Sequence, residues 1–226
     1  MKNLISVFII TLLTISVSAQ EKKTVALKKF NELKAFDRIN VILIKSSENK
    51  VVVTGDNIGD VNIDNNKGLL KIKMDFENQM DGGDIEAKVY YTEELSLIDA
   101  NENAKVTSEE TFAVSKAKIA VQEGGKVTLK IKANDLYIKS TSGGQITLTG
   151  NCKVQEIVVN AGGKVFNEKM DTKNTQVRVN AGGTAKIKAS LKVDAKVRAG
   201  GSIYIYGNPK EVEKDKVFGG KIQIMD

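Results

Sequence analysis

The chain has 226 residues, no histidine and one cysteine, and its 34 lysine and arginine residues outnumber its 28 aspartate and glutamate residues, which gives a formal net charge of +6. The lack of histidine excludes Ser-His and Cys-His nucleophile arrangements and most zinc sites, and a single cysteine excludes an intramolecular disulfide. The lysines are interleaved with acidic residues instead of being clustered, which favours a solvated surface of mixed charge and gives no reason to expect nucleic-acid binding.

The first 19 residues have the features of a secretory signal peptide. Lys2 supplies the positive charge, an apolar run extends from Leu4 to Ile15, and small residues lead to Ala19, after which we expect cleavage. An uncleaved anchor is the weaker alternative, because the apolar run is shorter than the roughly 20 residues that a spanning helix needs. The mature chain, residues 20–226, is therefore expected to be one secreted domain without a membrane span.

Residues 20–99 contain alternating apolar runs without a glycine rhythm, and we interpret them as opening strands or a cap. A solenoid needs its end coils covered, because exposed backbone would recruit further strands. The runs extend from Ile39 to Ile44, Val51 to Val53, Val61 to Ile63, Leu69 to Met74 and Ile85 to Tyr91.

The segment 75–84 separates two of these runs and carries four acidic residues around Gly82-Gly83, namely Asp75, Glu77, Asp81 and Asp84. We interpret it as a solvated hairpin loop. A calcium-binding loop is the alternative. The same acids are the place where a polysaccharide-acting enzyme would have to work, since β-helix enzymes of that kind use aspartates on one outer face.

Residues 100–207 form a repeat of about 19–20 residues marked by Gly-Gly pairs. Apolar residues alternate with period two on either side of each pair, which predicts short strands that turn at the glycines. The glycines fit corners where φ is positive or where backbones pass closely. Asn103-Ala104 and Gly219-Gly220 fit the same template. The pairs of the regular coils are Gly124-Gly125, Gly143-Gly144, Gly162-Gly163, Gly182-Gly183 and Gly200-Gly201.

Four columns of the repeat are almost wholly aliphatic. Counted from the first glycine of each pair, they are Val121, Ser140, Val159, Val179 and Val197 three before; Ile119, Ile138, Ile157, Val177 and Ala195 five before; Val127, Ile146, Val165, Ala185 and Ile203 three after; and Leu129, Leu148, Asn167, Ile187 and Ile205 five after. Lysines and other polar residues fill the positions between them. One register kept through five repeats predicts coils stacked about 4.8 Å apart with the aliphatic columns inside, which is an all-β parallel β-helix.

Residues 208–226 are predicted as a loop and a closing strand. The segment from Asn208 to Val217 contains the only proline, Pro209, and a run of charged residues, which is typical of a loop. Ile222 and Ile224 then continue the alternation of the repeat.

Exposed aromatic residues among cations are the candidate binding site on the late coils. Phe166, Tyr204 and Tyr206 fall beside Lys186, with Arg178 across the glycine corner. Such groups can hold a sugar ring or a partner protein. The alternative is that they stack on one another as cross-strand pairs that stabilise the sheet.

Acidic residues outside the segment 75–84 form no obvious acid and base pair. Glu123 and Glu168 stand in columns of their own, whereas Glu156 and Asp194 share a column with Gln176 between them, roughly 10 Å apart by strand spacing. We therefore predict no catalytic residue, cofactor or metal site.

The order of several segments resembles the putative autotransporter adhesin head domain family, also called the GIN domain, of secreted envelope proteins. The segments are FDRINVILIKSSENKVVVTGDN, GLLKIKMD, VVNAGGKVFN, RVNAGGTAKIKA and YGNPKEVEKDKVFGGKIQIMD, within residues 36–226. The resemblance implies a right-handed β-helix located in the periplasm or on the surface of a Gram-negative-type envelope, and it supplies no catalytic residues. We therefore expect a non-enzymatic binding module, whose partner is an envelope glycan, a surface protein or a second copy of the chain.

Overall fold

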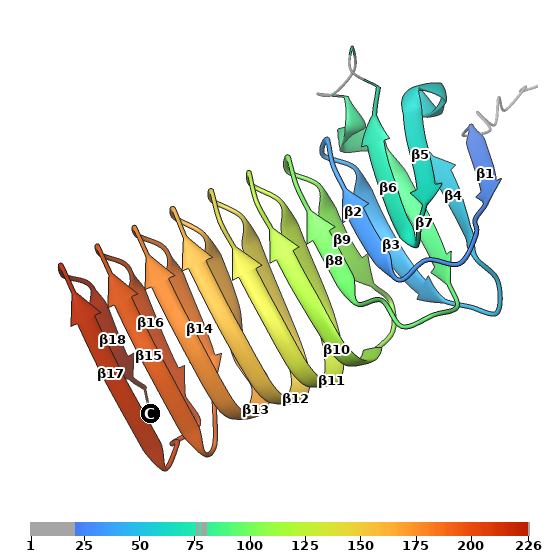
Figure 1. Cartoon of the computed structure of the whole chain (residues 1–226). Helices are drawn as coiled ribbons and strands as arrows, with labels where there is room; N and C mark the ends of the chain where they lie inside the picture. Colours follow the sequence, from blue (N-terminus) through green and yellow to red (C-terminus); the bar gives the residue numbers. More distant parts are fainter. Residues whose placement is uncertain (1–20, 76, 78–80, 226) are drawn as a thin grey trace, which may run out of the picture.

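The computed structural model describes residues 21–75, 77 and 81–225, so the predicted signal peptide lies outside the described part of the chain. The fold is an all-β parallel β-solenoid, as the repeat predicted (Figure 1). Within the described residues, no helix combines the length and the apolar character that crossing a membrane requires.

Two faces of strands run along the stack. The first face contains β5 (Val61–Asn66), β6 (Leu69–Met74), β2 (Glu32–Ala35), β8 (Leu97–Ala100), β15 (Lys192–Arg198) and β17 (Glu211–Val217). The second contains β1 (Lys22–Ala26), β4 (Lys50–Thr54), β7 (Glu86–Tyr91), β3 (Asn40–Lys45), β9 (Lys105–Ser108), β14 (Thr184–Lys188), β16 (Ser202–Tyr206) and β18 (Lys221–Ile224). The long strands β10 (Phe112–Val121), β11 (Lys126–Ser140), β12 (Gln145–Asn160) and β13 (Lys164–Asn180) bend from one face to the other. The faces meet at a glycine corner and at the bend, which we call the opposite corner.

The inward columns predicted from the repeat are confirmed. Their members pair in register from coil to coil, for example Val127 with Ile146 and Ile146 with Val165. None of the four columns has a member more than 2% exposed. Full burial of each Val, Leu or Ile stabilises the fold by about 1.5–3 kcal/mol, and the neighbouring coils supply that burial.

The polar exceptions in these columns are hydrogen-bonded. The Ser140 Oγ donates to the Gly144 carbonyl at 2.7 Å and accepts from the Lys164 N–H at 3.1 Å. Outside the inward columns, Asn160 and Asn180 form the side-chain ladder expected for stacked asparagines, with the Asn180 Nδ2 2.8 Å from the Asn160 Oδ1.

The two glycines of the pairs before β11, β12 and β13 have different roles, and the turn is centred one residue earlier than the pair suggested. At the corner before β11, Glu123 and Gly124 have φ of 51° and 76°, and the Gly125 N–H donates to the Gln122 carbonyl at 2.9 Å. Positive φ at both central residues is what a type I′ turn requires. The second glycine lies against the previous coil, because a Cβ on Gly125 would lie 2.1 Å from the Ala100 carbonyl oxygen.

The opening residues form both coils and a cap. The coil of β2 and β3 lies between the coil of β6 and β7 and the coil of β8 and β9, so the order of these coils in space departs from their order in the chain. Beyond the coil of β6 and β7, β4 pairs antiparallel with β1 and β7, and β5 pairs antiparallel with β6. These antiparallel strands interrupt the parallel stack at that end (Figure 1).

The prediction of a loop from Asn208 to Val217 is wrong for most of that segment. Glu211–Val217 is strand β17, which pairs in parallel with β15. Lys214 and Lys216 continue the inward columns of Ala195 and Val197, and both lysines are exposed. Among the described residues, β17 pairs only with β15, so its inward positions have a coil on one side only. Of the described residues of this end coil, only Val212 and, on β18, Ile222 still pack against the core, and lysine on an edge strand opposes further pairing.

Candidate binding surface

Four of the five predicted site residues lie together on the second face. Phe166 on β13 pairs with Lys186 on β14, Lys186 pairs with Tyr204 on β16, and Tyr206 pairs with Lys188 beside them. We call Phe166, Lys186, Tyr204 and Tyr206 the aromatic row. All four side chains are half-buried, because outward positions on a flat sheet are shielded only by their neighbours.

Arg178 lies on the first face, where it pairs with Val158 and Lys196. The structure therefore places it across the glycine corner from the aromatic row, as the repeat indicated. It is a separate feature of the surface, because the two faces point in different directions.

Cations lie over two rings of the row. The Lys186 Nζ is 5.4 Å from the centroid of the Phe166 ring, and the Lys221 Nζ is 5.4 Å from that of Tyr204. Such contacts contribute about 0.5–1 kcal/mol at exposed sites. The row thus makes cross-strand contacts that stabilise the sheet and still exposes part of its aromatic surface.

A β-bulge beside Phe166 shapes the surface. Thr147 pairs with Phe166 but Thr149 pairs with Lys169, so that Asn167 and Glu168 together oppose Leu148. The Asn167 Oδ1 accepts the Leu148 N–H at 3.2 Å. A bulge of this kind redirects side chains.

The Asn167 side chain also begins a buried polar network. Its Nδ2 donates to the Gln155 Oε1 at 3.1 Å, and the Gln155 Nε2 donates to the Thr175 Oγ1 at 3.0 Å. This network explains why an asparagine interrupts an aliphatic column, since each buried polar group needs a partner.

A hollow of about 350 Å³ lies beside the bulge and is lined by Thr147, Phe166, Glu168, Lys169 and Lys186, among others. The Glu168 Oε2 is buried and accepts no hydrogen bond from another described residue, while its Oε1 is 3.9 Å from the Lys186 Nζ. Sequence reasoning missed Thr147, Glu168 and Lys169 as part of this surface. The available signal was the spacing of 20 residues from Gly162 to Gly182, one more than from Gly143 to Gly162, which marks an inserted residue.

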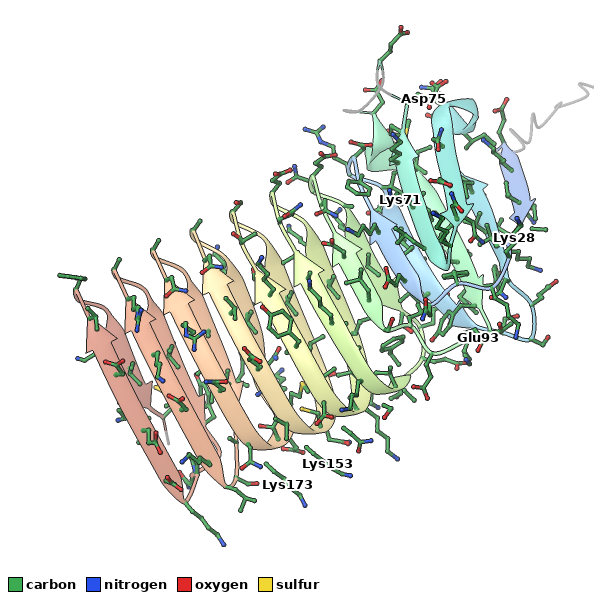
Figure 2. All side chains as sticks on the ribbon, viewed as in Figure 1. Lys28, Lys71, Asp75, Glu93, Lys153 and Lys173 are labelled. Atoms are coloured by element: carbon green, nitrogen blue, oxygen red, sulfur yellow. The ribbon has the colours of Figure 1, made fainter. Side chains whose placement is uncertain are left out.

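The acidic segment 75–84 lies in the cap, between β6 and β7, and residues 76 and 78–80 are outside the described chain. Asp75, Glu77, Asp81 and Asp84 are all exposed, and Figure 2 shows Asp75 at the capped end of the stack. Within the described ranges, no three Asp, Glu or Cys side chains gather in a way that could hold a metal ion. A role of this segment in calcium binding or catalysis therefore stays a prediction.

A carboxyl pair joins two turns of the glycine corner. A hydrogen bond with Asp37 raises the pKa of Glu102 to about 7, and burial and the charges of Asp37 and Glu123 act in the same direction. Asp37 is itself buried, and its Oδ2 accepts the Met74 N–H at 2.9 Å. The pair connects the turn after β2 with the turn after β8.

We expect this pair to make stability depend on pH. Between about pH 4.5 and 7 the native chain holds a proton on Glu102 that the unfolded chain releases, so the free energy of unfolding should fall as pH rises through this window. Glu102→Gln should flatten the pH dependence of the free energy of unfolding in this window. Glu109→Gln, at an exposed position, should leave that dependence unchanged. Urea unfolding at several pH values measures the slope, and an equal slope in Glu102→Gln and the native chain would refute the assignment.

Comparison with known proteins gives a family and a fold. The family model described as "Putative auto-transporter adhesin, head GIN domain" matches residues 29–209. No curated protein sequence matches the chain.

Three solved structures have the same fold over almost the whole chain. A putative adhesin from Bacteroides fragilis NCTC 9343 has 18% identity and a TM-score of 0.82, covering 92% of this chain and 98% of its own. A putative adhesin from Parabacteroides distasonis ATCC 8503 has 20% identity and a TM-score of 0.74, with 91% and 97% covered. A protein of the same organism described as a putative lipid binding protein has 14% identity and a TM-score of 0.73, with 93% and 98% covered. On the family match, the chain belongs to the auto-transporter adhesin head GIN domain family.

Proposed function

We propose that the chain is a secreted, non-enzymatic binding module of the cell envelope, which recognises a glycan or a surface protein through the aromatic row. The observation that carries this proposal is the register of Phe166, Lys186 and Tyr204 across three coils, next to a hollow of about 350 Å³. The adhesin description of the family supports a role in surface recognition.

The physical basis is a rigid array of side chains. The paired strands hold neighbouring side chains of the row at the strand spacing of about 4.8 Å, so little conformational entropy is lost when a ligand orders them. Aromatic faces pack on the apolar face of a sugar ring or on a partner's side chain, and the lysines contribute charge at the rim.

Replacing Phe166 and Tyr204 together with alanine should weaken partner binding by about tenfold or more and leave the fold intact. Both side chains are half-buried on the outer surface, and truncation of an aromatic contact typically reduces binding by more than about 1 kcal/mol. A glycan array and retention on isolated envelope fractions measure the binding, and thermal unfolding monitors the fold.

The matched control replaces Tyr90 and Tyr137, which are also half-buried but lie outside the row. This variant should bind like the native chain. Equal binding by the native chain and the Phe166→Ala, Tyr204→Ala variant would remove the row from the proposal.

A further inference from the structure

A groove of about 720 Å³ lies at the opposite corner. Its lining comes from Glu94, which precedes β8, from β10, β11, β12 and β13, and from Ser190. The strand pairing places these segments on successive coils, so the groove runs along the axis of the stack. Figure 2 shows Lys153 and Lys173 projecting from this edge.

The groove exists because small side chains occupy the bend. Along its floor Cys152 pairs with Thr172, and Ala133 lies at the equivalent position one coil earlier, since Lys132 pairs with Asn151. An Ile or Leu column there would fill the space. Burial raises the pKa of the Cys152 thiol to about 12, with the charge of Asp135 adding to the shift, so at neutral pH the floor presents a protonated, unreactive thiol.

Unpaired positive charge borders the groove. Lys132, Lys153 and Lys173 line it and all three are exposed, and none of their side chains forms a hydrogen bond or an ion pair with another described residue. Lys153 and Lys173 occupy equivalent positions on adjacent coils, since Cys152 pairs with Thr172. Like charges at such positions repel each other, so the pair does not stabilise the fold.

The acidic residues of the groove do not neutralise these lysines. The Asp171 Oδ1 is 2.7 Å from the Lys188 Nζ, and the Glu94 Oε2 accepts the Ser115 N–H at 2.9 Å. Lys188 thus balances the charge of Asp171, whereas the neutral Ser115 N–H leaves the charge of Glu94 in place. Because three lysines line the groove, it still presents a net positive charge.

We propose that this groove binds an acidic polysaccharide, a chain of sugars that carry carboxylates, laid along the axis of the solenoid. Lys153 and Lys173 bind the carboxylates, and Ser115, Asn134 and Asn151 supply hydroxyl and amide groups for the sugar hydroxyls. An extended peptide is disfavoured, because peptides dock on sheets by pairing with a free strand edge and the central groove strands β11 and β12 are paired on both sides.

The groove deepens the proposed binding function but uses a different surface from the aromatic row. The row lies on the second face across β13, β14 and β16, whereas the groove lies at the corner and begins at β10. Each site can therefore be tested without disturbing the other.

The test is calorimetric titration of the mature chain with a galacturonate hexamer, a neutral glucose hexamer and a polyglutamate peptide. We expect the galacturonate hexamer to bind, the neutral hexamer not to bind, and the peptide to bind at least about tenfold more weakly. Binding should weaken with added salt, because it depends on exposed charges.

Lys153→Glu with Lys173→Glu should weaken galacturonate binding by about tenfold or more. Lys126→Glu with Lys130→Glu makes the same change of charge at exposed positions of β11 outside the groove lining and should leave binding unchanged. Thermal unfolding checks that both variants fold.

Four results would overturn the groove proposal: no galacturonate binding by the native chain, binding of the neutral hexamer as tight as that of galacturonate, equal losses in the two lysine variants, or polyglutamate bound as tightly as galacturonate. The Phe166→Ala, Tyr204→Ala variant should bind galacturonate like the native chain. Failure of the aromatic row and failure of the groove are therefore distinguishable.

Discussion

Gly125→Ala is expected to lower the free energy of unfolding by about 4 kcal/mol or more, or to prevent folding. The new Cβ would lie 2.1 Å from the Ala100 carbonyl oxygen of the preceding coil and 3.0 Å from the Gln122 carbonyl oxygen of its own turn. The Ala100 carbonyl cannot move away without separating the two coils. Urea unfolding followed by circular dichroism measures the change.

Gly143→Ala is the matched control. Gly143 has φ of +75°, but a Cβ there would meet nothing within 4 Å. Left-handed backbone costs an alanine about 1–2 kcal/mol, and Ala161 already adopts φ of 45° in an equivalent corner. Similar losses of unfolding free energy in the Gly125→Ala and Gly143→Ala variants would show that the second glycine serves the turn alone and not the contact between coils.

Val159→Asp is expected to destabilise the chain by roughly 4 kcal/mol or more. Val159 is fully buried between Ser140 and Val179 of the neighbouring coils, so a carboxylate there would lose its hydration without gaining a cationic partner. Thermal and urea unfolding measure the loss.

Lys164→Asp places the same carboxylate five residues along the chain at an exposed position and should change the free energy of unfolding by no more than about 0.5 kcal/mol. Comparable shifts for the two variants would contradict the assignment of inward and outward columns.

The regular coils were predictable because each one repeats the same two constraints. Period-two alternation identifies the buried side of a strand, and a fixed spacing of glycine pairs identifies the register between strands. The inward columns from Val127 to Ile203 follow from these two signals alone, and the structure confirms them.

The roles of the two glycines were not separable from the sequence. Both a left-handed turn and a close approach of two backbones select glycine, and only the geometry shows that Gly124 serves the first and Gly125 the second. The residue before the pair, such as Ala161, adopts positive φ without any sign in its identity.

Non-local pairing explains the remaining differences. The insertion of the β2 and β3 coil between two later coils depends on contacts between residues far apart in the chain, which a local pattern does not encode. Strand β17 keeps little of the apolar pattern because it pairs with a coil on one side only, among the described residues. The groove had a signal, a column of small residues that includes Ala133, Cys152 and Thr172, but small residues at a corner are also compatible with a plain bend.

The measurement that tests the binding role most directly is light scattering with size-exclusion chromatography of a long polygalacturonate incubated with the mature chain. We predict that the polymer elutes with the protein and keeps its original chain length, as the proposed binding and non-enzymatic role require. Separate elution would contradict polysaccharide binding. Shortened polymer, with the shortening abolished by Asp81→Ala, would contradict the non-enzymatic role and place activity in the acidic segment of the cap.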